Sequence, residues 1–351
     1  MINSLHQFQS RVEQLRSFFE DAEIINVLTS TRMLEKEKIS EKSDLSSYLI
    51  HLQSSKMNRR VQTYVSGIIL LYGLFEQYVE EVLIDYLEEL DLTIGNFGDM
   101  PEKIRENHTN LSAQLLLNRD LDKYRDRCNE QDIIKCMHSC INDGPFRLNT
   151  LAFTDHRSNF RIESLNRFFE PVGISGMSAH IKQTIAFKNY KAKKFPNQTT
   201  NNLPDKIVFA DLDDLVWRRN VVAHGWTDDT LSIDMMKERT EFICVLGECI
   251  YEVLRQNALS HIIKHRCHSL PKPLNVFNSS IVCFRLESGS IAKDSQIIAC
   301  QSNGSYLEGK ITKIELNHVQ QTEVVAPPSV DIACLVDFKA KPNYRYFLVN
   351  K

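Results

Sequence analysis

Apolar side chains recur at spacings of three and four residues along most of the first 265 positions. Such spacing places them on one face of a helix and the polar residues on the other. In the clearest case, the segment 60–90, Ile68, Leu71, Phe75 and Val79 share one side. The same pattern predicts helices over residues 5–28, 161–169, 211–225 and 232–265, with shorter helical pieces within 110–141. We therefore expect a helical bundle.

Beyond Pro271 and Pro273 the pattern changes to short β-rich runs separated by Gly, Asn and Pro. The predicted strands cover residues 280–286, 296–299, 309–314, 319–325, 331–337 and 345–349. We expect them to close into a small barrel, because closure removes exposed strand edges. The expected fold class is mainly α, a helical bundle followed by a small C-terminal β-barrel, with domains over residues 1–268 and 275–351.

Composition indicates where the protein works and what it binds. The 351 residues carry 42 Lys and Arg against 45 Asp and Glu, a net charge of −3, so any surface that attracts nucleic acid must be local. The nine cysteines are odd in number and scattered through apolar runs, which indicates reduced thiols. The first ten residues lack a signal-peptide pattern, and the longest apolar run, 65–75, is too short to span a bilayer. We expect a cytoplasmic protein without membrane contact.

Candidate chemistry is concentrated in residues 217–225. Arg219, Asn220 and His224 lie there among apolar neighbours on a predicted helix. A guanidinium suits a phosphate, and an imidazole can accept or donate a proton near neutral pH. On a regular helix Arg219 and His224 point about 140° apart. Either the helix ends irregularly near Gly225, or two copies of the segment face each other across a two-fold axis.

The spacing of Arg219, Asn220 and His224 resembles the Arg-x4-6-His motif of the HEPN superfamily. Residues 67–80 resemble the long second helix of its RiboL-PSP-type members, and residues 160–174 resemble the segment before their motif helix. The resemblance covers about residues 1–268. It implies a helical bundle that dimerises through the motif helices and cleaves RNA without a metal ion.

The residues suggest how this reaction would proceed. His224 would take the ribose 2′-OH proton or protonate the leaving 5′-oxygen, while Arg219 and Asn220 hold the phosphate. The purely structural alternative is that Arg219 forms an ion pair with Asp213 or Asp214, and that His224 only caps a helix. We predict an endoribonuclease used as a toxin or in antiviral defence. The alternatives are a non-catalytic RNA-binding or scaffold protein, and a toxin component silenced by an antitoxin or defence-system partner.

The C-terminal region resembles the second-domain β-barrel of translational GTPases, through residues 284–297, 309–314 and 324–335. In those proteins the barrel helps to hold tRNA or contacts the ribosome, so the resemblance implies a targeting module. The turn at Pro327, Pro328 and Ser329 departs from their glycine-bearing form, which puts any ligand role of that turn in doubt. A barrel that only docks on the helical domain is the other reading.

Weaker signals concern RNA and metal binding. Lysines alternate with aromatic residues between 182 and 195, a pattern that attracts phosphates and stacks on bases, although a solvated flexible loop would look the same. The candidate RNA contacts are Lys182, Lys188, Lys191, Lys193, Lys194 and Arg218.

Two groups of Cys and His residues are candidate zinc ligands, and neither has the paired spacing of a zinc site. They are Cys128, Cys136, His138 and Cys140, and His261, His265, Cys267 and His268. We expect neither a metal nor a cofactor.

Overall fold

The computed structural model describes residues 1–29, 44–142, 144–194, 203–225 and 229–350. The chain divides into two compact units. The first comprises Met1–Leu87, Pro101–Asn142 and Arg147–Val253 and is helical. The second comprises mainly Glu88–Met100 and Leu254–Lys351 and contains all the described strands. The predicted fold class, mainly α with a helical bundle followed by a small C-terminal β-barrel, is confirmed, and the barrel is a curled half-barrel. The domain limits expected from composition, 1–268 and 275–351, stay a prediction.

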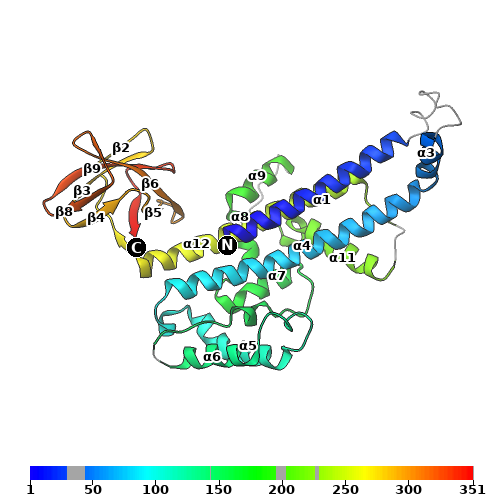
Figure 1. Cartoon of the computed structure of the whole chain (residues 1–351), viewed down its shortest axis with the longest axis horizontal. Helices are drawn as coiled ribbons and strands as arrows, with labels where there is room; N and C mark the ends of the chain where they lie inside the picture. The colour runs from blue at the N-terminus through cyan, green and yellow to red at the C-terminus, as the bar shows by residue number, and fades with distance from the viewer. Residues whose placement is uncertain (30–43, 143, 195–202, 226–228, 351) are drawn as a thin grey trace. The chain divides into compact units, whose positions relative to one another are not determined.

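Helices make up the larger unit (Figure 1). The last residues of α4 and of α12 are assigned to the second unit. The bounds of the helices are α1 Ile2–Leu28, α3 Asp44–Ser54, α4 Lys56–Thr93, α5 Glu102–Asn118, α6 Glu130–Ile141, α7 Ile162–Phe169, α8 Met177–Gln183, α9 Ile185–Lys194, α10 Asp205–Val208, α11 Ala210–Ala223 and α12 Ile233–Arg266. Short 3-10 turns lie at Phe97–Asp99, Thr150–Thr154 and Glu170–Val172. No helix in the described ranges is long and apolar enough to cross a membrane.

Helices α1, α4 and α12 form the core of the helical unit. Helix α1 runs antiparallel to α4, since Ser4 bonds Asp85 whereas Arg11 bonds Gln77. Phe8 stacks on Tyr78 with the ring centroids 4.3 Å apart, and the Tyr78 hydroxyl donates to the Gly247 carbonyl of α12 at 2.8 Å. Glycine permits this close packing, because a Cβ at Gly247 would lie 2.5 Å from the Phe8 ring.

The second unit carries an antiparallel sheet in the order β1-β10-β5-β6-β9-β3-β2, with β7 paired to β6, and a separate β4-β8 ribbon. The strands are β1 Cys267–Ser269, β2 Asn275–Phe277, β3 Ile281–Leu286, β4 Gly289–Ala292, β5 Gln296–Cys300, β6 Tyr306–Leu316, β7 Val319–Gln321, β8 Glu323–Ala326, β9 Val330–Val336 and β10 Arg345–Val349. Its core includes Val282, Phe284, Ile297, Ile311 and Tyr346.

Two details of this unit correct the expectation from sequence. The strand expected over 319–325 is two strands, β7 and β8, which pair with different partners. The main sheet forms a curled half-barrel with β1 and β2 at the two ends of its strand order, whereas a closed barrel was expected. Both end strands have only three residues, so little unpaired backbone is exposed at those edges.

Candidate active site at the end of helix α11

Helix α11 (Figure 1) carries Arg219 and Asn220 near its C-terminal end, and His224 directly follows its last residue. Asp211 and Asp213 in its first turn suit the positive end of the helix dipole. The helix ends at Ala223; His224 is its C-cap, and Gly225 has a φ of +82°, in the left-handed region that favours glycine. His224 is exposed. The irregular helix end, one of the two alternatives raised by the sequence, is therefore present in a single chain.

Arg218 belongs to a buried ion-pair network. Its side chain contacts Asp214 at 3.0 Å, the Tyr64 hydroxyl at 3.2 Å, and both the carbonyl and the carboxylate of Asp229. Arg239 of α12 joins the network by pairing with Asp211 and Asp214. Arg218 is only 8% exposed. The ion pair to Asp214 that was considered for Arg219 is thus formed by its neighbour, and the guanidinium of Arg218 is already engaged within the chain.

Arg219 lies in different surroundings. Its guanidinium is 5.4 Å from the ring centroid of Tyr72 on α4, within cation–π range, and Nη1 donates to the Asn220 side-chain carbonyl at 3.3 Å. It makes no ion pair with a carboxylate among the residues that the structure describes. A half-buried guanidinium without a counterion can accept an anionic ligand such as a phosphate.

Asn220 is held by a residue that the sequence did not indicate. Asn159 Nδ2 donates to Asn220 Oδ1 at 2.8 Å. Because that oxygen accepts from both Asn159 and Arg219, the Asn220 amide nitrogen keeps its two protons for a further acceptor. Asn159 directly precedes the segment 160–174 that carries the family resemblance, but no pattern in the sequence pairs it with a residue 61 positions away.

Tyr72 connects α4 to the same segment. Its hydroxyl accepts from the Phe160 backbone N–H at 3.0 Å and donates to Glu76 at 3.0 Å. Burial raises the pKa of the Tyr72 hydroxyl well above its ordinary value, so the group stays neutral and keeps its proton for Glu76. Tyr72 thus places its aromatic ring against the Arg219 guanidinium and holds the backbone of Phe160, which follows Asn159.

About two turns beyond Tyr72 on α4, Glu80 forms a polar cluster. Its carboxylate contacts Lys123 at 2.7 Å and His156 Nε2 at 2.8 Å. Burial alone would raise the pKa of Glu80, but the hydrogen bonds from His156 and Lys123 outweigh it and lower that pKa. The His156 ring also packs on Phe160 at 4.3 Å between centroids. This cluster anchors the start of the segment that carries Asn159.

The lysines proposed as RNA contacts lie on α8 and α9, so the solvated-loop alternative for this stretch is wrong up to Lys194. Phe195 lies outside the described residues. Lys182 pairs with Asp205, Lys194 with Asp211 and Lys193 with Glu241. Lys191 is 5% exposed, and Lys188 donates to the Gln183 carbonyl. Most of these cations therefore have partners within the chain.

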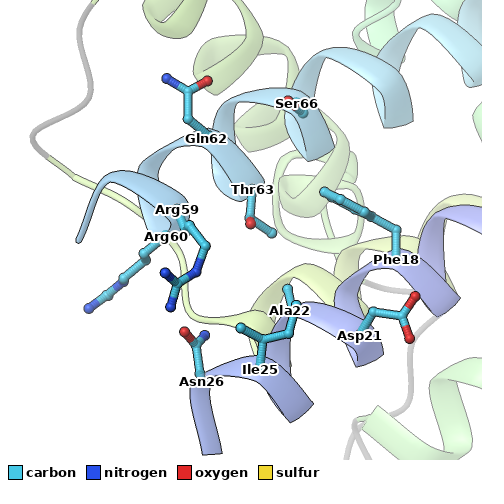
Figure 2. A pocket seen from close by; sticks show the side chains of 10 residues that line it. All are labelled: Phe18, Asp21, Ala22, Ile25, Asn26, Arg59, Arg60, Gln62, Thr63 and Ser66. Atoms are coloured by element: carbon cyan, nitrogen blue, oxygen red, sulfur yellow. The ribbon is translucent and has the colours of Figure 1, made fainter. Parts of the chain in front are cut away.

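A separate cavity of about 430 Å³ lies between α1 and α4, lined by Phe18, Asp21, Ala22, Ile25, Asn26, Arg59, Arg60, Gln62, Thr63 and Ser66 (Figure 2). None of the three candidate catalytic residues lines it. Within the described part of the chain, no group of three or more His, Cys, Asp or Glu side chains is arranged to hold a metal ion.

Comparison with known proteins identifies the family of the chain. The sequence model of the RiboL-PSP-HEPN family matches residues 36–256, which is more than half of the chain and includes α4, α7 and α11. No curated protein matches the chain. HEPN domains generally work with RNA, and many are ribonucleases. On this match and this helical fold, the chain is a member of the RiboL-PSP-HEPN family.

Proposed function

We propose that the protein is a metal-independent endoribonuclease, with Arg219, Asn220 and His224 as its catalytic residues. The observation that carries the proposal is the arrangement at the end of α11: a guanidinium without a carboxylate partner among the described residues, an amide with free donors, and an exposed imidazole beyond the last helical residue. Family membership supports RNA as the substrate.

The reaction follows from these groups. The ribose 2′-oxygen attacks the adjacent phosphorus and the bond to the 5′-oxygen breaks, which gives a 2′,3′-cyclic phosphate and a 5′-hydroxyl. An imidazole accepts the 2′-OH proton or supplies the proton that the leaving oxygen requires. Arg219 and the Asn220 amide hold the non-bridging oxygens as charge builds on them. Removing the 2′-OH proton and protonating the leaving 5′-oxygen need two groups, or one group that does both in turn.

A homodimer would supply the second group. Two copies of α11 related by a two-fold axis can bring two Arg219 and two His224 side chains to one cleft. The exposed side chain of Trp217, 47% accessible on the same helix, would add contact area to such an interface. The wider role we propose is that of a cytoplasmic toxin or defence effector, restrained by an antitoxin or defence-system partner.

The central experiment is RNA-end sequencing after expression of the full chain. We expect discrete cuts with 2′,3′-cyclic phosphate ends for the wild type and none for His224→Ala. The matched control is His6→Ala, because His6 is also an exposed histidine of the helical unit. Cuts that persist in folded His224→Ala protein would overturn the assignment of the site.

Mixing two inactive variants tests the shared cleft. In a shared cleft, a heterodimer of Arg219→Ala and His224→Ala keeps one Arg219 and one His224, whereas each variant's homodimer lacks one of the two residues altogether. At full subunit exchange half of the dimers are mixed, so we expect partial recovery of RNA cleavage, to at most about half of the wild-type rate. No recovery, despite exchange shown by mass-tagged chains, rejects a site built in that way.

A non-catalytic RNA-binding protein is the second candidate. One observation favours it: no side chain in the described ranges hydrogen-bonds the His224 imidazole, whereas a general base is usually oriented by a partner. That function predicts RNA binding without cleavage in the wild type. The same sequencing experiment therefore separates the two candidates.

For the half-barrel we propose a targeting role towards tRNA or the ribosome, on its resemblance to the second domain of translational GTPases. A chain lacking residues 270–351 should then keep its cleavage rate on short RNA and lose its choice among cellular RNAs. A truncated chain that only aggregates would make the half-barrel structural.

A further inference from the structure

Arginines next to the candidate site have no carboxylate partner among the described residues, unlike several cations of α8, α9, α11 and α12. Arg157 and Arg161 are exposed and, like Arg219, form no ion pair with any described residue. By contrast, Lys182, Lys193, Lys194, Arg218 and Arg239 all pair with Asp or Glu. A cation already paired within the chain must give up that partner to bind a phosphate, whereas an unpaired one does not.

The segment that carries these two arginines contacts α11 at two points. Asn159 bonds Asn220 at 2.8 Å, and Arg161 Nη1 donates to the Asp213 carbonyl at 3.4 Å. Asp213 and Asn220 are seven residues apart on the helix, a rise of about 10 Å. The segment 159–161 therefore runs beside α11 towards its N-terminus, with Arg161 about two turns from the Arg219–Asn220 pair.

The backbone of this segment is rigidly held. Phe160 is fully buried, and its N–H donates to the Tyr72 hydroxyl at 3.0 Å. Ser164 Oγ donates to the Asn159 carbonyl at 2.6 Å and accepts from the Arg161 N–H at 2.8 Å. Side chains on a backbone fixed in this way lose less freedom when they bind a ligand than side chains on a loose loop.

We propose that Arg157 and Arg161 bind the phosphates of an RNA single strand next to the one held by Arg219 and Asn220. The proposal rests on the proposed function and extends it: the strand lies along residues 157–161, and the lysines of α8 and α9 contribute little. Contacts of this kind position the strand and do not read its sequence. Nearby carboxylates do not cancel them, since neither Asp155 nor Asp213 forms an ion pair with either arginine.

Salt dependence of binding tests the proposal. The probe is a fluorescent 12-nucleotide RNA with 2′-O-methyl riboses, which cannot be cleaved, and the readout is anisotropy across a NaCl series. Each phosphate contact with a single strand contributes about 0.7 to the slope of log K against log salt. We expect Arg157→Gln/Arg161→Gln in the full chain to weaken binding about tenfold and to lower the slope by about 1.4.

The matched control is Lys193→Gln/Lys194→Gln, which removes the same charge from exposed positions on α9 that already pair with Glu241 and Asp211. We expect less than about a twofold change for it. Arg157→Lys/Arg161→Lys keeps the charges and should retain most of the slope, which excludes misfolding as the cause. Equal losses in the two Gln variants, an unchanged slope, or no RNA binding by the wild type would overturn the proposal.

Because the probe cannot be cleaved, failure of the proposed function is read separately. A wild-type chain that binds through Arg157 and Arg161 but cuts no natural RNA leaves the binding surface standing and rejects the ribonuclease. If the wild-type chain cuts RNA but Arg157→Gln/Arg161→Gln leaves the slope of log K against log salt unchanged, the ribonuclease stands and the binding surface is rejected.

Discussion

Two groups of side chains on α11 differ sharply although they share one helix. Those of the paired face, Asp211, Asp214 and Arg218, are tied to Arg239 and Tyr64 by ion pairs and hydrogen bonds. Those of the open end, Arg219, Asn220 and His224, have polar groups that the described chain leaves available. A side chain's role here depends on the face of the helix that carries it, and the type of residue does not decide it.

Arg218 and Arg219 show the physical reason. One residue turns a helix by about 100°, so neighbours face different surroundings. Arg218 turns into the protein, where a buried charge must be paired because water no longer solvates it. Arg219 turns towards the Tyr72 ring, which attracts a cation without neutralising it. The first arginine can therefore stabilise the fold while the second stays available to a ligand.

The largest effect is expected at the open end. Arg219→Ala should lower the rate of RNA cleavage about a thousandfold, because a group that stabilises transition-state charge is removed. The free energy of unfolding should change by less than about 0.5 kcal/mol, since no ion pair is lost. Single-turnover cleavage and urea unfolding of the same preparations measure both. A folded variant that keeps its cleavage rate would remove the distinction between the open end and the paired face.

On the paired face, Arg218→Ala should lower the free energy of unfolding. Removing this buried partner leaves Asp214 and the Tyr64 hydroxyl with fewer contacts, and the loss is expected to be about 3 kcal/mol. Cleavage per folded molecule should stay within about tenfold of wild type. The control is Arg125→Ala, an exposed arginine paired only with Asp122. If Arg218→Ala is as stable as that control but inactive, Arg218 belongs to the site.

A smaller effect is expected where the open end is held in place. Asn159→Ala removes the donor to Asn220, so the amide can turn, and kcat should fall about tenfold with little change in KM. Ser158→Ala, an exposed neighbour, serves as the control. A change in KM alone would show that Asn159 contacts RNA directly and does not act through Asn220.

No effect is expected from chelation. The proposed reaction at the open end uses only side chains and the ribose 2′-OH, so EDTA should leave the initial rate unchanged. The rate with and without EDTA, followed by addition of Mg²⁺, Mn²⁺ or Zn²⁺, measures this. If EDTA abolishes RNA cleavage and a divalent ion restores it, the reaction uses a metal ion and the metal-independent mechanism is wrong.

Local patterns in the sequence determined the elements. The 3.6-residue period predicted α1, α4, α7, α11 and α12, because burial of one helix face requires that spacing within each segment itself. Gly225 marked the end of α11, since its positive φ favours glycine. The C-terminal strands were found in the same way, except for β1, β2 and β4, whose three or four residues are too few to show an alternation.

Tertiary structure decided which polar groups are already engaged. Asn159 meets Asn220 across 61 positions, Phe160 meets Tyr72 across 88, and Arg218 meets Tyr64 across 154. The lysines of α8 and α9 lie in a stretch of sequence without Asp or Glu, yet three of them, Lys182, Lys193 and Lys194, pair with carboxylates of α10, α12 and α11. Periodicity reports burial along one element, whereas ion pairs and hydrogen bonds depend on which elements meet in space, and that is fixed only when the whole bundle packs.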